Sequence, residues 1–197
     1  QMLGGKFRDK IRIYCDTDIH GKHDGKTMGK VLKERIETRG YNIVKMDLSA
    51  DELCFEVPGA TTCPTDHMRE ALADAEKKGM QYRAIENIEN MTKEERQEII
   101  KVRNDVVFRE CFPGNQRGIH LTEKGLDIME EYVKEVRDVV GMEIPIATDH
   151  FGPISIGSCI KLAQRLEKYN LAWLEDMVPW MQADDLAEIQ RNTTAPL

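Results

Sequence analysis

Two acidic residues stand directly after short apolar runs in the second half of the chain. Asp149 follows residues 144–148, and Glu175 follows residues 171–174. Runs of this kind are typical of buried strands in a parallel sheet. Carboxylates at the carboxyl ends of neighbouring parallel strands converge on one point and make an oxygen-rich pocket suited to Mg²⁺. Position alone leaves open the alternative that each acid caps the helix that follows it.

Three further side chains are candidates for acid–base work at the same end of the sheet. Lys45 and Asp47 stand one residue apart at the end of an earlier apolar run, and strand alternation turns both to one face. His150 follows Asp149 directly and is a candidate base, a candidate substrate contact or a buried structural histidine. Lys45 as part of a structural ion pair is the alternative to a catalytic role.

Three more residues are candidate substrate contacts. His20 and His23 lie in the loop after the first apolar run, on the expected active-site side, although this loop has no rigid metal-ligand spacing. Trp180 follows the fourth apolar run and is a candidate wall of the pocket, with ordinary packing as the alternative.

Short apolar runs alternate with amphipathic stretches along the chain. The expected strands are residues 10–15, 42–46, 144–148 and 171–174, and the expected helices are residues 29–38, 122–140, 155–169 and 184–191. This alternation predicts an α/β fold with a parallel sheet. An open doubly wound sheet and an eight-stranded barrel both satisfy it. No glycine fingerprint follows any of the runs, which disfavours an open nucleotide-binding sheet.

Residues 49–118 interrupt the alternation after the second run. They begin with a loop whose residues 57–64 are rich in Pro, Gly and Thr. Two polar helical stretches are expected next, at residues 65–79 and 92–104, the second opening on a Thr92–Glu95 capping box. Long insertions in barrels usually lie over the active site or at subunit contacts, and simple surface elaboration is the alternative.

Composition excludes several classes of protein. The net charge of −7 argues against a nucleic-acid footprint, which requires clustered Lys and Arg. No stretch approaches the roughly 20 apolar residues of a membrane span, and the first residues do not resemble a signal peptide. The five cysteines are scattered and form no Cys-x-x-Cys pair, which favours reduced thiols. We therefore expect a cytoplasmic protein that binds neither nucleic acid nor membranes.

Five motifs resemble, in their order, the mandelate racemase branch of the enolase superfamily. They are LGGK at residues 3–6 with Arg8 and Asp9, NIVKMD at residues 42–47, IATDH at residues 146–150, WLED at residues 173–176 and QRNTTAP at residues 190–196. The third and fourth resemble the first two metal motifs of that family, and their acids are separated by 26 positions, as one barrel unit of the family needs. Each motif is weak alone, but their order is specific.

The resemblance implies a fold and a domain organisation. Residues 1–197 should form the first half of a TIM-type (β/α) barrel with parallel strands, with residues 49–118 as an insertion after the second strand. The family's capping domain and remaining barrel strands, including the third metal carboxylate, would then belong to other parts of a longer polypeptide. Half a barrel exposes sheet edges, so it needs the rest of that polypeptide or a partner. We also expect a homo-oligomer.

The resemblance also implies a reaction. In the family, Mg²⁺ binds the carboxylate of a small carboxylic acid and steadies the anion formed when the α-proton leaves. Asp47 stands where the family usually has a second lysine. His150 precedes the usual histidine position, which Phe151 fills. These departures favour dehydration of a sugar acid, an aldonate or aldarate. A racemase or epimerase, and a catalytically silent member with a binding role, remain as alternatives.

Overall fold

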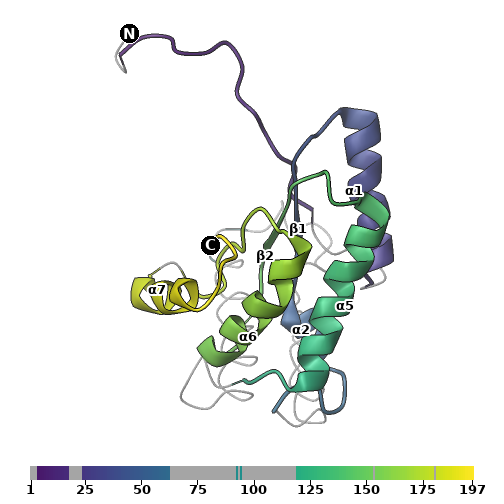
Figure 1. Ribbon diagram of the computed structural model, residues 1–197, viewed down its shortest axis with the longest axis vertical. Helices are drawn as coiled ribbons and strands as arrows, with labels where there is room; N and C mark the ends of the chain where they lie inside the picture. The colour runs from purple at the N-terminus through teal and green to yellow at the C-terminus, as the bar shows by residue number, and fades with distance from the viewer. Residues whose placement is uncertain are drawn as a thin grey trace.

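The computed structural model describes residues 4–17, 24–62, 92, 94, 119–152, 154–179 and 181–197. Two buried strands, β1 (Val44–Asp47) and β2 (Ile146–Asp149), pair in parallel near the centre of the molecule (Figure 1). Their register places Asp47 opposite Asp149. The last residues of the two strands are therefore acidic and adjacent.

Helices flank the strands in the alternating order expected from the sequence. They are α1 (Gly25–Arg39), the short α2 (Ala50–Cys54), α5 (Glu123–Val140), α6 (Ile156–Leu166) with the 3₁₀ turn η3 (Glu167–Tyr169), and α7 (Ala183–Arg191). Each helix in the described part of the chain is too short or too polar to cross a lipid bilayer.

The helix boundaries agree with the sequence except at the first two helices. The expectations for α5, α6 and α7 match within one residue at each end, counting η3 with α6. The expected first helix was too short, because α1 begins after an N-cap at Asp24, whose carboxylate accepts from the Thr27 amide at 2.8 Å. α2, inside the expected insertion, was not anticipated.

Backbone hydrogen bonds extend the parallel arrangement on both sides of the two strands. On one side, Lys45 N donates to Cys15 O at 2.8 Å. On the other side, Leu174 bridges in parallel to Thr148, and its amide donates to Pro196 O at 2.8 Å. Five successive segments of the chain therefore lie side by side in sequence order, which is the order of strands in a (β/α) barrel.

The outer segments are less regular than the sequence suggested. Of the expected first strand, residues 10–15, only Cys15 makes a bridge, and Ile11 and Ile13 are exposed. The N-terminal segment extends away from the rest of the molecule (Figure 1). The expected fourth strand is likewise reduced to the single bridge at Leu174. The parallel α/β class is confirmed, while the half-barrel stays a prediction.

α1 and α5 lie alongside one another, and two glycines of α1 set how closely they approach (Figure 1). A Cβ atom added at Gly25 would lie 2.1 Å from Tyr132 O, and one at Gly29 would lie 2.8 Å from Val139 Cβ. Since interiors are close-packed, a larger residue at either point would push the helices apart.

The described ends of the insertion are held together. Thr62 N donates to His120 O at 3.0 Å, and Thr122 N donates to Ala60 O at 3.0 Å. The chain therefore leaves the α/β unit and re-enters it at neighbouring points.

The structure describes residues 49–62 of the expected insertion, together with Thr92 and Glu94. The expected helical stretches at residues 65–79 and 92–104, with the Thr92–Glu95 capping box, fall outside the described residues, apart from Thr92 and Glu94. The position of the insertion over a site or at a subunit contact stays a prediction.

Candidate metal and catalytic site

The ammonium group of Lys45 lies between two carboxylates at the carboxyl ends of neighbouring segments. Its Nζ is 2.6 Å from Asp149 Oδ2 and 3.2 Å from Glu175 Oε1. Lys45 belongs to β1, Asp149 ends β2, and Glu175 follows the bridge at Leu174. Asp149 and Glu175 therefore converge on one cation, which is the geometry expected from their strand-end positions.

The charge state of Lys45 follows from this environment. Burial lowers the pKa of Lys45, but the hydrogen bonds to Asp149 and Glu175 raise it by more, so the pKa lies above the ordinary lysine value. Lys45 is therefore a cation at neutral pH in this arrangement. It supplies positive charge to the site and holds no free lone pair for a proton.

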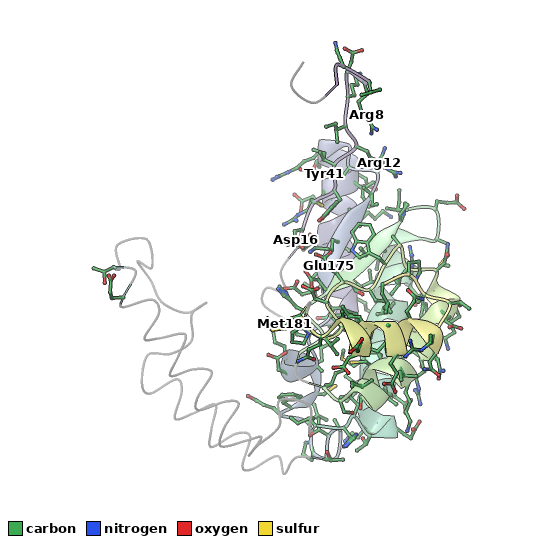
Figure 2. The ribbon with its side chains drawn as sticks, turned by 90° about the vertical axis from the view of Figure 1, so that its left-hand side faces the viewer. Arg8, Arg12, Asp16, Tyr41, Glu175 and Met181 are labelled. Carbon is green, nitrogen blue, oxygen red and sulfur yellow. The ribbon has the colours of Figure 1, made fainter. Side chains whose placement is uncertain are left out.

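Two side chains near Lys45 were not among the sequence candidates. Asp16 Oδ1 lies 3.8 Å from Lys45 Nζ, and the ring centroid of Tyr14 lies 5.9 Å from the same atom. Figure 2 shows the labelled Asp16 close to Glu175, with Arg12 further toward the N-terminal segment. One signal could have identified Asp16, since it directly follows an apolar run, as the two strand-end acids do.

Trp173 is a third residue that sequence reasoning missed as part of the site. Its indole N–H donates to Glu175 Oε2 at 2.8 Å. Its ring meets the Tyr14 ring edge-to-face, with centroids 5.4 Å apart and an interplanar angle of 73°. Trp173 precedes Glu175 by two positions, so strand alternation would have placed both on one face.

Asp47 and His150 face each other beside this charged group. His150 Nδ1 is 3.7 Å from Asp47 Oδ1, the Asp47 side chain being 2% exposed and the His150 side chain 52%. His150 has a left-handed backbone (φ 57°), and its amide donates to Asp149 Oδ1 at 2.7 Å. The turn leaves a half-exposed imidazole that is accessible to a ligand and lies near a buried carboxylate.

Three sequence candidates for substrate contacts have no described position. His20, His23 and Trp180 lie outside the described residues. Their assignment as substrate contacts stays a prediction.

The fit of a magnesium ion depends on the chemistry of the donor atoms. Within the described ranges, no group of three or more His, Cys, Asp or Glu side chains is arranged to hold a metal ion. Asp149 and Glu175 nevertheless offer hard carboxylate oxygens to one point, which the Lys45 cation already contacts. Mg²⁺ is usually held by one or two protein carboxylates, with water and substrate oxygens completing its shell. The donor set therefore fits Mg²⁺, and Asp149 and Glu175 are the two described side chains that would hold it.

A family model and curated proteins give consistent matches. The model described as "Enolase C-terminal domain-like" matches residues 27–197. The D-xylonate dehydratase of Haloferax volcanii is 23% identical over 197 residues, which is 100% of this chain and 34% of that protein. The D-mannonate dehydratase of Sphingomonas sp. is 35% identical over 79 residues, 39% of this chain and 19% of that protein.

Solved structures match the fold of nearly the whole chain. A mandelate racemase/muconate lactonizing enzyme-like protein from Rubrobacter xylanophilus has a TM-score of 0.59 at 21% identity, covering 99% of this chain and 38% of that one. A mandelate racemase/muconate lactonizing protein from Paracoccus denitrificans, complexed with magnesium, has a TM-score of 0.53 at 13% identity, covering 98% of this chain and 34% of that one. The chain thus spans about a third of the length of these structures and of the Haloferax protein.

Proposed function

Because this chain belongs to the enolase C-terminal domain-like family, whose model matches residues 27–197, we propose that it is part of a dehydratase that removes water from a sugar acid. Curated relatives that match the chain are named as dehydratases of D-xylonate and D-mannonate, which supports this substrate class. The activity is that of the complete protein, since the chain covers about a third of the first of these relatives.

The observation that carries the proposal is the convergence of Asp149 and Glu175 on one cation. Lys45 Nζ contacts them at 2.6 and 3.2 Å, and only 6% of the lysine side chain is exposed. Asp149 and Glu175 would hold Mg²⁺. When bound, the ion supplies positive charge where negative charge develops on the substrate carboxylate.

The charge and exposure of three further side chains indicate the role of each in the reaction. Lys45, held between two carboxylates, adds positive charge beside the substrate carboxylate as the α-proton leaves. His150 is the acid–base group, because its imidazole is half-exposed and accessible to a ligand. Asp47 is buried and 3.7 Å from that ring, so it orients the imidazole rather than meeting substrate.

Dehydration is preferred to racemisation because of the residue types on β1. Racemisation needs a base on each face of the α-carbon. Asp47 stands where a lysine base would, and a carboxylate with a reference pKa near 4 is a weak base for an α-proton. Loss of water needs one base and one acid.

We also propose that the complete protein is a homo-oligomer and that the rest of the polypeptide completes the barrel.

A substrate screen of the complete protein tests the proposal. The protein would be incubated with Mg²⁺ in deuterated water and with aldonates, aldarates and simple 2-hydroxy acids in turn. A 2-keto-3-deoxy acid as product is the expected result. Deuterium incorporation with inversion and no keto acid would indicate a racemase instead. The absence of both turnover and Mg²⁺ binding would indicate a silent relative.

A further inference from the structure

The carboxylate of Glu175 is held from two sides by different donors. Lys45 Nζ contacts Oε1 at 3.2 Å, and Trp173 Nε1 donates to Oε2 at 2.8 Å. The Glu175 side chain is 35% exposed, so burial alone does not fix its orientation. An indole N–H is only a donor and has one direction. Its bond to Oε2 therefore sets the carboxylate plane and turns Oε1 toward Lys45.

The indole itself is held by Tyr14. The two rings meet edge-to-face with centroids 5.4 Å apart, a favoured aromatic arrangement. The Tyr14 ring also faces the Lys45 ammonium, which lies 5.9 Å from its centroid. The Tyr14 ring therefore contacts both of the groups that hold Glu175, Trp173 and Lys45.

We propose that Trp173 is a positioning residue for Glu175, holding one carboxylate oxygen so that the other is presented to a divalent cation. This inference rests on the proposed function in one respect, the assignment of Glu175 as a Mg²⁺ ligand. Partners that hydrogen-bond to metal ligands set ligand orientation, and their loss typically weakens metal binding by roughly 10- to 100-fold. Trp173 acts through Glu175 and takes no part in proton transfer.

The first test compares Trp173→Phe with the wild-type complete protein by calorimetric titration with MgCl₂. Phenylalanine keeps an aromatic ring against Tyr14 and removes the donor together with the five-membered ring that carries it. A dissociation constant for Mg²⁺ raised by roughly tenfold or more is the expected result. Tyr41→Phe, a conservative change ahead of β1, is the matched control and should leave that constant unchanged.

The second test reads the hydrogen bond without metal. In protein labelled with ¹⁵N-tryptophan, the indole N–H signal of Trp173 is assigned by its loss in Trp173→Phe. This signal should move upfield in Glu175→Ala, because the acceptor is gone. An unmoved signal would overturn the inference.

The Mg²⁺ titrations distinguish failure of the positioning role from failure of the metal assignment. If the wild type binds Mg²⁺ and Trp173→Phe has the same dissociation constant, the positioning role alone is overturned. No Mg²⁺ binding by the wild type would overturn the metal assignment, and the positioning role with it.

Discussion

Lys45 Nζ lies 2.6 Å from Asp149 Oδ2, in a pair whose two side chains are both buried. Breaking a buried pair of this kind by removing one partner usually destabilises a fold strongly, because the other charge is left without compensation. Here Glu175 is a second partner at 3.2 Å, so the lysine is shared between two carboxylates. The ammonium of Lys45 therefore holds two acids close together.

Asp149→Asn should remove Mg²⁺-dependent turnover of the true substrate while the protein stays folded. The amide still accepts a hydrogen bond from Lys45, but it no longer offers a charged oxygen to the ion. Turnover and circular dichroism of the complete protein would be measured together. Asp176→Asn, next to Glu175 in the chain, is the control and should keep its turnover. Near-normal turnover in Asp149→Asn would rule out the metal assignment.

Lys45→Met should make the protein more dependent on Mg²⁺ for its stability. Without the ammonium, Asp149 and Glu175 face each other with no cation between them, and like charges at short range are unfavourable. The rise in Tm on adding MgCl₂ should therefore be larger in the variant than in the wild type. Lys30→Met, on the exposed face of α1, should respond like the wild type. An equal rise in all three proteins would contradict the shared-cation arrangement.

His150→Gln should lower kcat by roughly 10²- to 10⁴-fold, the range of general acid–base catalysis, with little change in Mg²⁺ affinity. Asp47→Asn should lower kcat less, because Asp47 acts on the imidazole from 3.7 Å away. Steady-state kinetics of the complete protein would measure both effects. His120→Gln provides a matched histidine control at the base of the insertion. A normal kcat in His150→Gln would move the acid–base role to another residue.

Gly25→Ala should lower stability by about 1 to 3 kcal/mol, the usual range for overpacking. The added Cβ would meet Tyr132 O at 2.1 Å and Glu135 Cβ at 2.8 Å, so α1 and α5 would have to separate. Gly157→Ala is the matched control, since a Cβ there meets nothing within 4 Å and alanine favours a helix over glycine. Thermal unfolding should show a lower Tm in the first variant and an equal or higher Tm in the second. Equal Tm values for Gly25→Ala and the wild type would contradict the close approach of the helices.

Glu130→Gln should destabilise the protein at neutral pH and have a diminishing effect in acid. The hydrogen bond from Lys168, together with those from Tyr169 and Arg165, holds the pKa of Glu130 below its ordinary value of 4.5. A carboxyl whose folded pKa is lowered contributes stability above its unfolded pKa and loses it as the pH falls through the folded value. The wild-type advantage, about 1 kcal/mol or less, should therefore be constant near neutral pH and shrink in acid.

Urea unfolding of both proteins at a series of pH values would measure this advantage. Glu131→Gln, at the neighbouring and more exposed position of α5, is the control for loss of charge alone. An advantage of the wild type over Glu130→Gln that persists unchanged into strong acid would contradict the lowered pKa.

The adjacency of Asp149 and Glu175 could be predicted because it depends on strand order alone. Each acid follows an apolar run, and successive parallel segments bring such positions together. The family resemblance read from the motifs was likewise confirmed by the match over residues 27–197. The carboxyl ends of α1 and α5 were also predicted to within one residue, and a glycine C-cap follows each helix, at Gly40 and Gly141.

What could not be predicted depends on side-chain direction and on single backbone torsions. The left-handed φ of His150 accompanies an imidazole turned toward Asp47, and no residue type nearby requires that conformation. The contact between the Tyr14 and Trp173 rings joins segments that are far apart in sequence, and no pattern in the sequence pairs them. Ile11 was expected in a buried strand because it is apolar, but it is exposed. An apolar pattern does not show which other segment covers a strand.

The hydrogen bond between Thr62 N and His120 O ties the chain before the insertion to the chain after it. The chain leaves and re-enters the fold at one point, so the pairing of β1 with β2 does not depend on how many residues lie between. The entropy of closing a loop grows slowly, by about 0.6 kcal/mol for each doubling of length. An engineered segment of a different length could therefore be grafted between Thr62 and His120 at a small entropic cost to the rest of the fold.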